Sequence, residues 1–267
     1  MCKNVSLKTD SEWILLMKTF IVNLEKDIAK KEKILEQTEK LNLKAEIIPA
    51  VYGKNLSKED LKNLVYDYPN CALTLGEIGC ALSHLNIYNK MVKDDIPIAF
   101  ILEDDVILSK DIVPMLDFLE KSNDKNKPNV YLMSYMIDYL PFTKKKTPVG
   151  NMYKIYRSYC TCAYVINKEA AKKLSKMQTP IKFEADMWES FRFISGINVY
   201  GIIPHLVYEE DVRKEFSSIE NERLTLKRKR KNFRAKLILK YGPRIAIKKF
   251  FYRTIVKLLF RKRNKKK

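Results

Sequence analysis

Glycine is scarce in this sequence, and its scarcity excludes the glycine-rich phosphate-binding motifs. Only seven glycines occur in 267 residues, and neither G-x-G-x-x-G nor G-x-x-x-x-G-K-[ST] is present. Both motifs depend on glycine because the backbone must approach a phosphate closely. The chain therefore has no dinucleotide fingerprint and no P-loop, and any phosphate that it binds must be held by side chains and a metal ion.

Cysteines are also few, and their spacing is irregular. The five cysteines are at positions 2, 71, 80, 160 and 162, an odd number with no C-x-x-C pair. This pattern indicates neither a disulfide framework nor a paired zinc motif. Cys160 and Cys162 lie in an apolar run, where free cysteine behaves as a small buried hydrophobe. We predict a reducing, cytoplasmic location.

Long hydrophobic runs are absent as well. No stretch reaches the roughly 18 uncharged apolar residues of a membrane span. The short apolar stretch 13–17 follows Asp10 and Glu12, where a signal peptide would carry basic residues. We therefore expect no cleaved leader and no transmembrane helix. Residues 17–24 read as a complete first strand that opens with its own methionine, so residues 1–16 are interpreted as a possible N-terminal extension.

Acidic residues are missing from the C-terminal tail, residues 223–267. This tail holds 20 lysines and arginines, whereas the preceding 222 residues hold 31 basic and 32 acidic residues. The formal net charge of +19 therefore belongs to the tail. A segment this basic favours an anionic partner, either a membrane surface or nucleic acid.

Apolar residues recur in the tail at helical spacing. They lie three to four residues apart, with a Gly242-Pro243 break, and are Leu237, Tyr241, Ile247, Phe251, Ile255 and Leu258. The pattern predicts a basic amphipathic helix, typical of a membrane-surface element. Each cation near an anionic leaflet contributes about 1 kcal/mol. We favour a membrane surface over nucleic acid, because phosphate contact does not need so much phenylalanine, isoleucine and leucine.

Three adjacent carboxylates, Glu103, Asp104 and Asp105, interrupt the apolar run 98–108. An acidic triplet is often a solvated turn, but here apolar residues continue on both sides, as in a buried strand. Neighbouring negative charges repel one another unless a cation lies beside them. Mg²⁺ and Mn²⁺ take carboxylate oxygens together with substrate phosphates. We therefore predict a metal-assisted diphosphate site and a nucleotide-activated substrate.

Predicted strands and helices alternate along the first 222 residues. Hydrophobic periodicity places strands at 18–23, 45–49, 98–108, 129–135, 152–157 and 160–166, a strand and loop at 198–208, and helices at 27–41, 76–93, 111–121 and 168–177. Ser57 and Asp60 predict a capping box at the start of a further short helix. This alternation favours an α/β sandwich around a mainly parallel sheet.

Three segments stand out in order along the chain: Phe20-Ile-Val-Asn-Leu-Glu-Lys-Asp27, Leu75-Gly-Glu-Ile-Gly-Cys-Ala-Leu-Ser-His84 and Ala99-Phe-Ile-Leu-Glu-Asp-Asp-Val106. Together they resemble glycosyltransferase family 25, the bacterial lipooligosaccharide galactosyltransferase type, which is also related to collagen-modifying galactosyltransferases. Weaker matches extend the resemblance over roughly residues 17–210. Two positions depart from the pattern. Lys30 or Lys31 stands where relatives often have arginine, and lysine lacks the bidentate fork of arginine that suits phosphate. Cys160 stands where glycine is frequent.

The resemblance implies a GT-A fold, a Rossmann-like α/β domain over residues 17–222, followed by the basic tail at 223–267. It implies that Glu103 and Asp105 flank a D-x-D-type motif and hold Mn²⁺ or Mg²⁺, with Asp105 as the principal ligand and Asp104 between them at the nucleotide sugar. The metal would offset the charge of the leaving diphosphate. The other residues expected to border the nucleotide sugar are Asn23, Leu24, Glu25, Ala50, Val51 and Gly53.

The resemblance also implies an inverting transferase, which needs one general base for the acceptor hydroxyl. Asp186 is the first candidate and Glu184 the second, although an acid at 186 also fits a helix cap. His84, on an apolar helix, is more often a hydrogen-bonded core residue than a ligand, yet Glu77 would share its face toward the cleft. We therefore keep His84 and Glu77 as candidate donor-site residues, and His205 as a candidate late metal ligand.

The predicted activity is transfer of a hexose, with galactose as the expected sugar, from a UDP-sugar to a lipooligosaccharide or lipopolysaccharide core acceptor. The alternative is a non-catalytic adaptor that binds membrane or nucleic acid through its basic tail. Carboxylate repulsion inside an apolar strand speaks against the adaptor, since a scaffold gains nothing from it. The expected partners are the UDP-sugar, a lipid-linked oligosaccharide and the anionic inner face of the inner membrane, with no nucleic acid.

Overall fold

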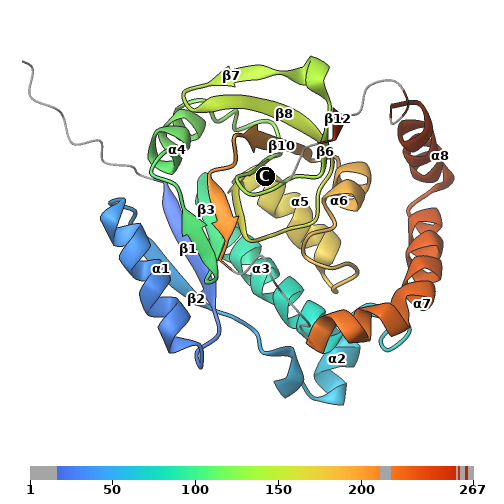
Figure 1. The fold of residues 1–267 in the computed structure, drawn as a ribbon. Coiled ribbons are helices and arrows are strands. Elements are labelled where there is room, and N and C mark those ends of the chain that lie inside the picture. The colour runs from blue at the N-terminus through green and yellow to red at the C-terminus, as the bar shows by residue number, and fades with distance from the viewer. Residues whose placement is uncertain (1–16, 211–217, 257, 259–261, 264–267) are drawn as a thin grey trace, which may run out of the picture.

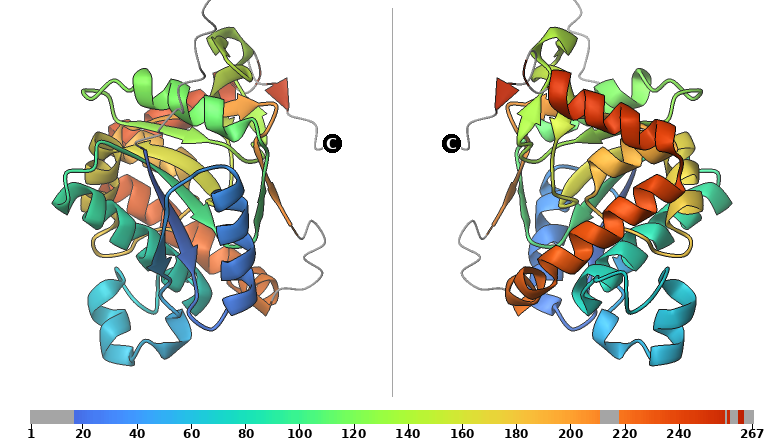
Figure 2. Two further views of the ribbon diagram at one scale, coloured as in Figure 1. Left: turned by 90° about the vertical axis from the view of Figure 1, so that its left-hand side faces the viewer. Right: turned by 90° about the vertical axis from the view of Figure 1, so that its right-hand side faces the viewer.

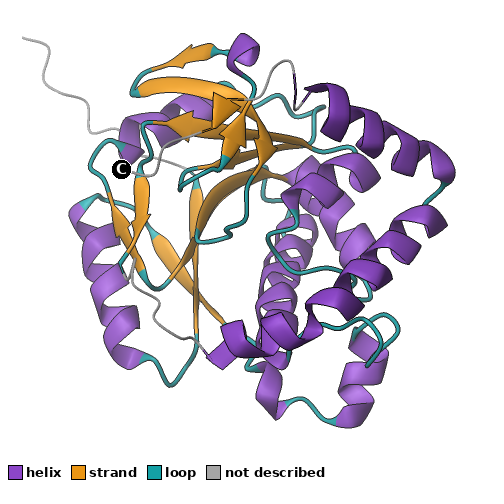
Figure 3. Cartoon of the chain, turned by 45° about the vertical axis from the view of Figure 1, so that its right-hand side comes forward, coloured by secondary structure: helices purple, strands orange, loops and turns teal. Residues whose placement is uncertain are grey.

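A large central sheet with helices on both of its faces forms the body of the protein (Figures 1 and 3). The computed structural model describes residues 17–210, 218–256, 258 and 262–263. The predicted extension at 1–16 lies outside the described residues. The strands are β1 (Lys18–Asn23), β2 (Ala45–Pro49), β3 (Ile98–Glu103), β4 (Val106–Leu108), β5 (Asn129–Leu132), β6 (Asp138–Tyr139), β7 (Lys145–Thr147), β8 (Gly150–Arg157), β9 (Ala163–Asn167), β10 (Asn198–Ile203), β11 (Val207–Glu209) and β12 (Lys262–Arg263). The α-helices are α1 (Ile28–Lys40), α2 (Lys58–Leu64), α3 (Leu75–Lys93), α4 (Ile112–Lys121), α5 (Lys168–Gln178), α6 (Trp188–Ser195), α7 (Ser218–Lys240) and α8 (Pro243–Phe251).

The strand order of the main sheet is β12-β6-β8-β10-β5-β9-β3-β1-β2, with β7 paired to β8. Strands β2, β1 and β3 are parallel neighbours, and β10 is parallel to β5. Strand β9 pairs antiparallel with both β3 and β5, so all five of these other strands run in one direction. Parallel neighbours need crossover connections, which α1 and α3 supply. The predicted α/β sandwich with a mainly parallel sheet is therefore confirmed.

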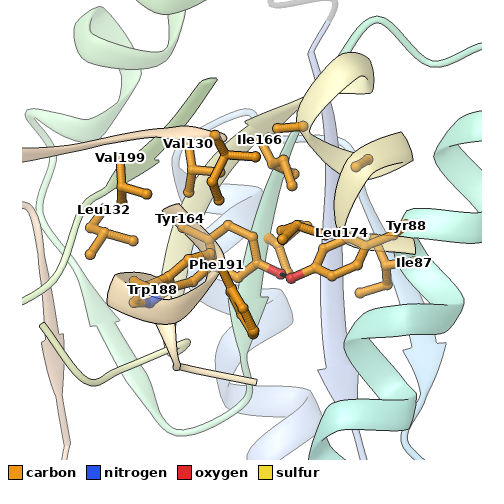
Figure 4. Close-up of a cluster of buried hydrophobic side chains, with 14 of the residues drawn as sticks. Ile87, Tyr88, Val130, Leu132, Tyr164, Ile166, Leu174, Trp188, Phe191 and Val199 are labelled. Atoms are coloured by element: carbon orange, nitrogen blue, oxygen red, sulfur yellow. Dashed lines mark hydrogen bonds between the residues drawn. The ribbon is translucent and has the colours of Figure 1, made fainter. Parts of the chain in front are cut away.

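Alternation along the strands divides the core between the two faces of the sheet. Phe20 and Val22 of β1 point to the face covered by α3, α5 and α6, whereas Ile21 points to the face covered by α1 and α4. Figure 4 shows the first of these clusters, in which Tyr164 and Trp188 are fully buried. The period-2 pattern of the sequence thus fixes which side chains fill each layer.

The sequence predicted one continuous strand at 98–108, but the acid-bearing run forms two strands. Strand β3 ends at Glu103, and Asp104 and Asp105 form a bend. Strand β4 then leaves the main sheet and pairs antiparallel with β11. Three adjacent charges are easier to solvate at a bend than inside a ladder, which explains the break. The capping box of Ser57 and Asp60 is present as predicted.

Residues 218–251, which include most of the described part of the basic tail, form the helices α7 and α8, with the predicted break at Gly242-Pro243 between them. Figure 2 shows these two helices along the side of the molecule that faces away from α1. The tail is not a separate appendage, because several of its side chains are buried against the domain. Arg230 and Leu237 of α7 and Lys249 of α8 are each less than one-tenth exposed. No helix in the described part of the chain is long and apolar enough to cross a membrane.

Candidate functional site

A pocket of about 490 Å³ lies at the carboxyl ends of β1, β2 and β3. In open α/β sheets this is the usual position of a ligand site, and the volume lies within the roughly 300–1,000 Å³ of small-molecule pockets. Its walls come from the acidic bend, the loop after β2, the loop and first turn after β1, and the first turns of α3. The lining residues are Val22, Leu24, Lys26, Asp27, Lys30, Ala50, Val51, Tyr52, Gly53, Lys54, Leu75, Gly76, Cys80, Ser83, His84, Glu103, Asp104 and Asp105.

Two glycines allow the loop after β2 to lie directly on α3. A Cβ atom at Gly53 would lie 1.8 Å from the carbonyl oxygen of Leu75, and one at Gly79 would lie 2.3 Å from that of Val51. Neither position can hold a larger side chain without backbone movement. The hydroxyl of Ser83 accepts a hydrogen bond from the Val51 amide at 2.8 Å and ties the loop to the helix. This wall of the pocket is therefore rigidly placed.

The three acids are held in different ways. The Asn23 side chain donates to Asp104 at 2.6 Å, and the Thr161 hydroxyl donates to Glu103 at 2.6 Å. The Lys30 ammonium lies 3.8 Å from carboxylate oxygens of both Asp104 and Asp105. Burial raises the pKa of Asp104, although the hydrogen bond from Asn23 and the charge of Lys30 act to lower it. An added cation would stabilise the ionised carboxylates, so the site fits a metal ion with oxygen ligands.

Positive charge also faces the pocket. Lys26, Lys30 and Lys54 all line it, and the Lys26 ammonium lies 4.3 Å from the centre of the Tyr52 ring. Acids and lysines around one pocket can hold a divalent cation and a phosphate group together. The sequence alone pointed to the first helix for the basic residue, at Lys30 or Lys31, but gave no indication of Lys26 or Lys54. The family resemblance placed the loops after β1 and β2 at the nucleotide sugar, and the fold brings the lysines of these loops to the pocket.

His84 lines the pocket and belongs to a chain of buried polar contacts. Its Nδ1 is 2.7 Å from the Tyr164 hydroxyl, which is 3.0 Å from that of Tyr88. Its Nε2 faces a carboxylate oxygen of Glu103 at 3.6 Å. The imidazole therefore connects the hydrophobic core to the acidic bend, as both a core residue and part of the pocket lining.

Several residues predicted for the nucleotide sugar do line this pocket: Leu24, Ala50, Val51, Gly53, His84, Glu103 and Asp104. Asp105, predicted as a metal ligand, lines it too. Asn23 is buried and holds Asp104 in place, whereas Glu25 is exposed and lies outside the lining.

The structure places Glu77 elsewhere. Its carboxylate accepts two hydrogen bonds from Arg230 of α7, at 2.9 and 2.7 Å, and one from the Thr74 amide at the start of α3. The predicted orientation toward the cleft is therefore wrong for Glu77. The Glu77 carboxylate instead contacts Arg230, which is distant in sequence, and forms the capping box with Thr74.

The two candidate bases differ in their surroundings. Glu184 is buried and forms ion pairs with Arg230 and Arg234 of α7, so its carboxylate is already engaged in holding the tail. Asp186 is half-buried just before α6 and does not line the pocket of Glu103. Trp188 is fully buried, and its indole donates to the Cys160 carbonyl at 2.9 Å. It supports the core.

His205 is not brought to the acidic bend. The ladder pairs Val207 with Leu108 and Glu209 with Val106, so His205 lies beyond the end of β4 that is remote from Asp105. It packs edge-on against Tyr135, and burial lowers the pKa of its imidazole. The register instead brings Glu210 next to Asp105, whose carbonyl accepts from the Glu210 amide at 3.0 Å. The predicted metal contact of His205 is therefore not supported.

Comparison with known proteins identifies relatives over most of the described domain. The model of glycosyltransferase family 25 (LPS biosynthesis protein) matches residues 17–188. A glycosyltransferase 25 family member of Drosophila melanogaster is 29% identical over 64% of this chain and 30% of that protein. Procollagen galactosyltransferase 2 of Homo sapiens is 26% identical over 58% of this chain and 26% of that protein.

A glycosyltransferase 25 family member of Anopheles gambiae is 31% identical over 71% of this chain and 36% of that protein. The matched region thus spans between 26% and 36% of the length of these relatives. Among solved structures, a glycosyltransferase involved in glycosylation of the major capsid of PBCV-1 aligns with a TM-score of 0.40 and 11% identity, covering 79% of this chain and 98% of that one. Since the family model covers well over half of the sequence, the chain belongs to glycosyltransferase family 25.

Proposed function

We propose that this protein transfers galactose from a UDP-sugar to a lipooligosaccharide or lipopolysaccharide core acceptor, with inversion at the anomeric carbon. The single observation that carries the proposal is the pocket at the carboxyl ends of β1 and β3, where carboxylates and lysines face one another. A nucleotide diphosphate needs this combination, because its phosphates require cations while a bridging metal ion requires acids. The name of the human relative, procollagen galactosyltransferase 2, supports galactose as the sugar.

The acidic bend fits a divalent metal ion of the hard class. Glu103 and Asp105 would hold Mn²⁺ or Mg²⁺, since both carboxylates line the pocket and both ions prefer oxygen ligands. When bound, the ion would stabilise the negative charge of the departing diphosphate. Lys30 lies 3.8 Å from Asp105 and so borders the same place. Its ammonium would add to that stabilisation and orient the phosphates.

An inverting transfer also needs a base that takes the proton of the acceptor hydroxyl. We assign this role to Asp186 because Glu184 is already occupied by two arginines. Asp186 is half-buried, and it lies two residues before Trp188, whose ring packs against Tyr164 at 5.2 Å. Trp188 and Tyr164 thus connect the start of α6 to His84 in the pocket, because the rings of Tyr164 and His84 lie 5.6 Å apart.

A membrane-bound acceptor fits the surface of α8. Side chains of both kinds needed at a lipid surface are exposed there, namely the apolar Ile247, Phe250 and Phe251 and the basic Arg244 and Lys248. Such a helix lies in the interface plane with its apolar side chains among the lipids. We propose that α8 holds the enzyme at the anionic cytoplasmic face of the inner membrane, where a lipid-linked core oligosaccharide would be in reach. The family description, LPS biosynthesis protein, supports this class of acceptor.

One donor assay tests the transferase proposal. The purified full chain is incubated with Mn²⁺ or Mg²⁺ and a panel of UDP-sugars, and release of UDP is measured for the native sequence, Asp105→Asn and Asp186→Asn. We expect UDP-galactose to be turned over fastest. Each substitution should lower kcat by at least about a hundredfold, as is usual for loss of a metal ligand or a general base.

Asp117→Asn is the matched control, because Asp117 pairs with Lys121 on the outer surface of α4. It should leave turnover unchanged. No turnover of any UDP-sugar, or turnover that survives both Asp105→Asn and Asp186→Asn, would contradict the mechanism and favour the non-catalytic adaptor.

A further inference from the structure

A second set of potential metal ligands lies in the wall of the pocket. It shares Glu103 with the acidic site but adds a thiol and an imidazole to it. The Sγ of Cys80, a ring nitrogen of His84 and a carboxylate oxygen of Glu103 all lie within 4.8 Å of one another. Cys80 and His84 are four residues apart on α3 and so share one helix face. Glu103 comes from the end of β3, which lies next to that face.

The imidazole of His84 is held in an orientation that suits a metal ligand. The residue is 1% exposed, and the contact between Nδ1 and the Tyr164 hydroxyl fixes the ring. Nε2 is buried and has no hydrogen-bond partner among the described residues, since the Glu103 oxygen at 3.6 Å is too far for a hydrogen bond. A buried polar atom without a partner costs free energy, so an ion between His84 and Glu103 would remove that cost.

Neighbouring groups provide the outer contacts that metal ligands usually have. Tyr164 contacts Nδ1 of His84 and is itself in contact with Tyr88, while the Thr161 hydroxyl donates to Glu103. Outer partners of this kind fix the orientation of the ligand side chains. The histidine and the carboxylate are therefore both pre-oriented before an ion arrives.

Thiolate and imidazole ligands select a different class of ion from carboxylates alone. They suit Zn²⁺ and related transition-metal ions, whereas Mg²⁺ prefers oxygen. All three ligands also line the pocket, and three protein ligands with one side open are typical of catalytic rather than structural zinc sites. We propose that Cys80, His84 and Glu103 bind a Zn²⁺-class ion in the wall of the donor pocket.

The other thiol cluster is not an equivalent candidate. Cys160, Cys162 and Glu209 also lie within 4.8 Å of one another. However, the Cys162 amide donates to the Cys160 thiol at 3.2 Å, and that thiol lies 3.5 Å from Glu209. These groups satisfy one another without an ion, so Cys160 serves as an internal control.

Metal binding can be measured directly, and the proposal does not depend on the transferase activity. The purified, reduced full chain is stripped with chelator, dialysed and titrated with Co²⁺ alone while absorbance is recorded. A cobalt-thiolate bond gives a charge-transfer band in the near ultraviolet, which oxygen ligands do not give. We expect a band that saturates at about one equivalent, in keeping with a single three-ligand site, and that Zn²⁺ abolishes by displacing the Co²⁺.

Substitutions assign the band to particular ligands. Cys80→Ala and the nearly isosteric Cys80→Ser should both remove it, whereas Cys160→Ala, Cys71→Ala and Asp105→Asn should retain it. Tyr164→Phe removes the hydroxyl that contacts His84 and Tyr88 but leaves all three ligands in place, so it should keep the band but weaken Co²⁺ affinity by about 10- to 100-fold. Circular dichroism of each variant confirms that it is folded.

The absence of a thiolate band from the native chain would overturn the proposal. So would a band that survives both Cys80 substitutions, or one that disappears in Cys160→Ala. Because none of these readouts uses a sugar donor, failure of the metal site and failure of the proposed transferase function are separate results.

Discussion

The sharpest prediction concerns Arg230, which joins the tail to the body of the protein. Its guanidinium donates to both oxygens of Glu77, at 2.9 and 2.7 Å, and to the Ala72 carbonyl at 3.0 Å, and it lies 3.1 Å from Glu184. The side chains of Arg230, Glu77 and Glu184 are 11%, 3% and 8% exposed. All three charges are thus largely removed from water.

Replacing Arg230 with alanine would leave Glu77 buried without its guanidinium partner, while Glu184 would retain Arg234. Removal of one partner of a buried ion pair typically costs about 3–5 kcal/mol. At roughly 2–4 °C per kcal/mol for a domain of this size, the melting temperature should fall by roughly 6–20 °C. The first turn of α3 also lines the pocket, so the KM for the sugar donor should rise as well.

Urea unfolding followed by circular dichroism measures this free energy. Lys231→Ala is the matched control, since Lys231 is the exposed neighbour on α7 and should change stability by less than about 0.5 kcal/mol. Glu77→Gln keeps a side-chain acceptor for the Thr74 amide, so combining it with Arg230→Ala should cost less than the two single changes added together. A loss below about 1 kcal/mol in Arg230→Ala, or strict additivity in the pair, would refute the reasoning.

Three further predictions follow from the contacts described. Gly53→Ala should destabilise the protein and weaken donor binding, because its Cβ would lie 1.8 Å from a carbonyl oxygen of α3; thermal melts and donor titration measure both. Burial acts to raise the pKa of Glu189, but its hydrogen bonds and ion pair with Arg253 and the charge of Lys249 outweigh it, and the net pKa is lowered. The stability that this pairing supplies is present above the unfolded-state pKa of 4.5 and is lost as pH falls through the lower folded-state pKa. Acid unfolding curves of Glu189→Gln should therefore show a smaller loss of stability over this pH range than those of the native sequence. Serine in place of both Phe250 and Phe251, which are 66% and 54% exposed, should weaken binding to anionic vesicles at least about tenfold without altering the melting temperature, as flotation and calorimetry would reveal.

Local patterns in the sequence predicted many of the strands and helices of this protein. The strand predicted at 18–23, the helices predicted at 27–41 and 76–93 and the capping box of Ser57 all follow from short-range periodicity and turn chemistry, and each is present. The acidic bend was identified because three charges in an apolar run conflict with burial. Such conflicts are visible without a structure.

The partners of individual side chains were harder to predict, because they come from distant parts of the chain. Glu77 and Glu184 were interpreted as pocket or catalytic acids, yet both contact Arg230, which is separated from them by 153 and 46 residues. The basic tail was interpreted as an addition to the domain, whereas its residues Leu237 and Lys249 are buried against the domain. Periodicity identifies an amphipathic face but does not say what covers it.

The position of β9 between β3 and β5 has a consequence for how the chain folds during synthesis. Strand β3 pairs with β1 on one side, but its other edge remains open until residues 163–167 have left the ribosome, some 60 residues later. An unpaired apolar edge is a template for intermolecular pairing, and pairings distant in sequence form slowly. Nascent chains and truncated fragments that end before β9 should therefore aggregate more readily than fragments that include it.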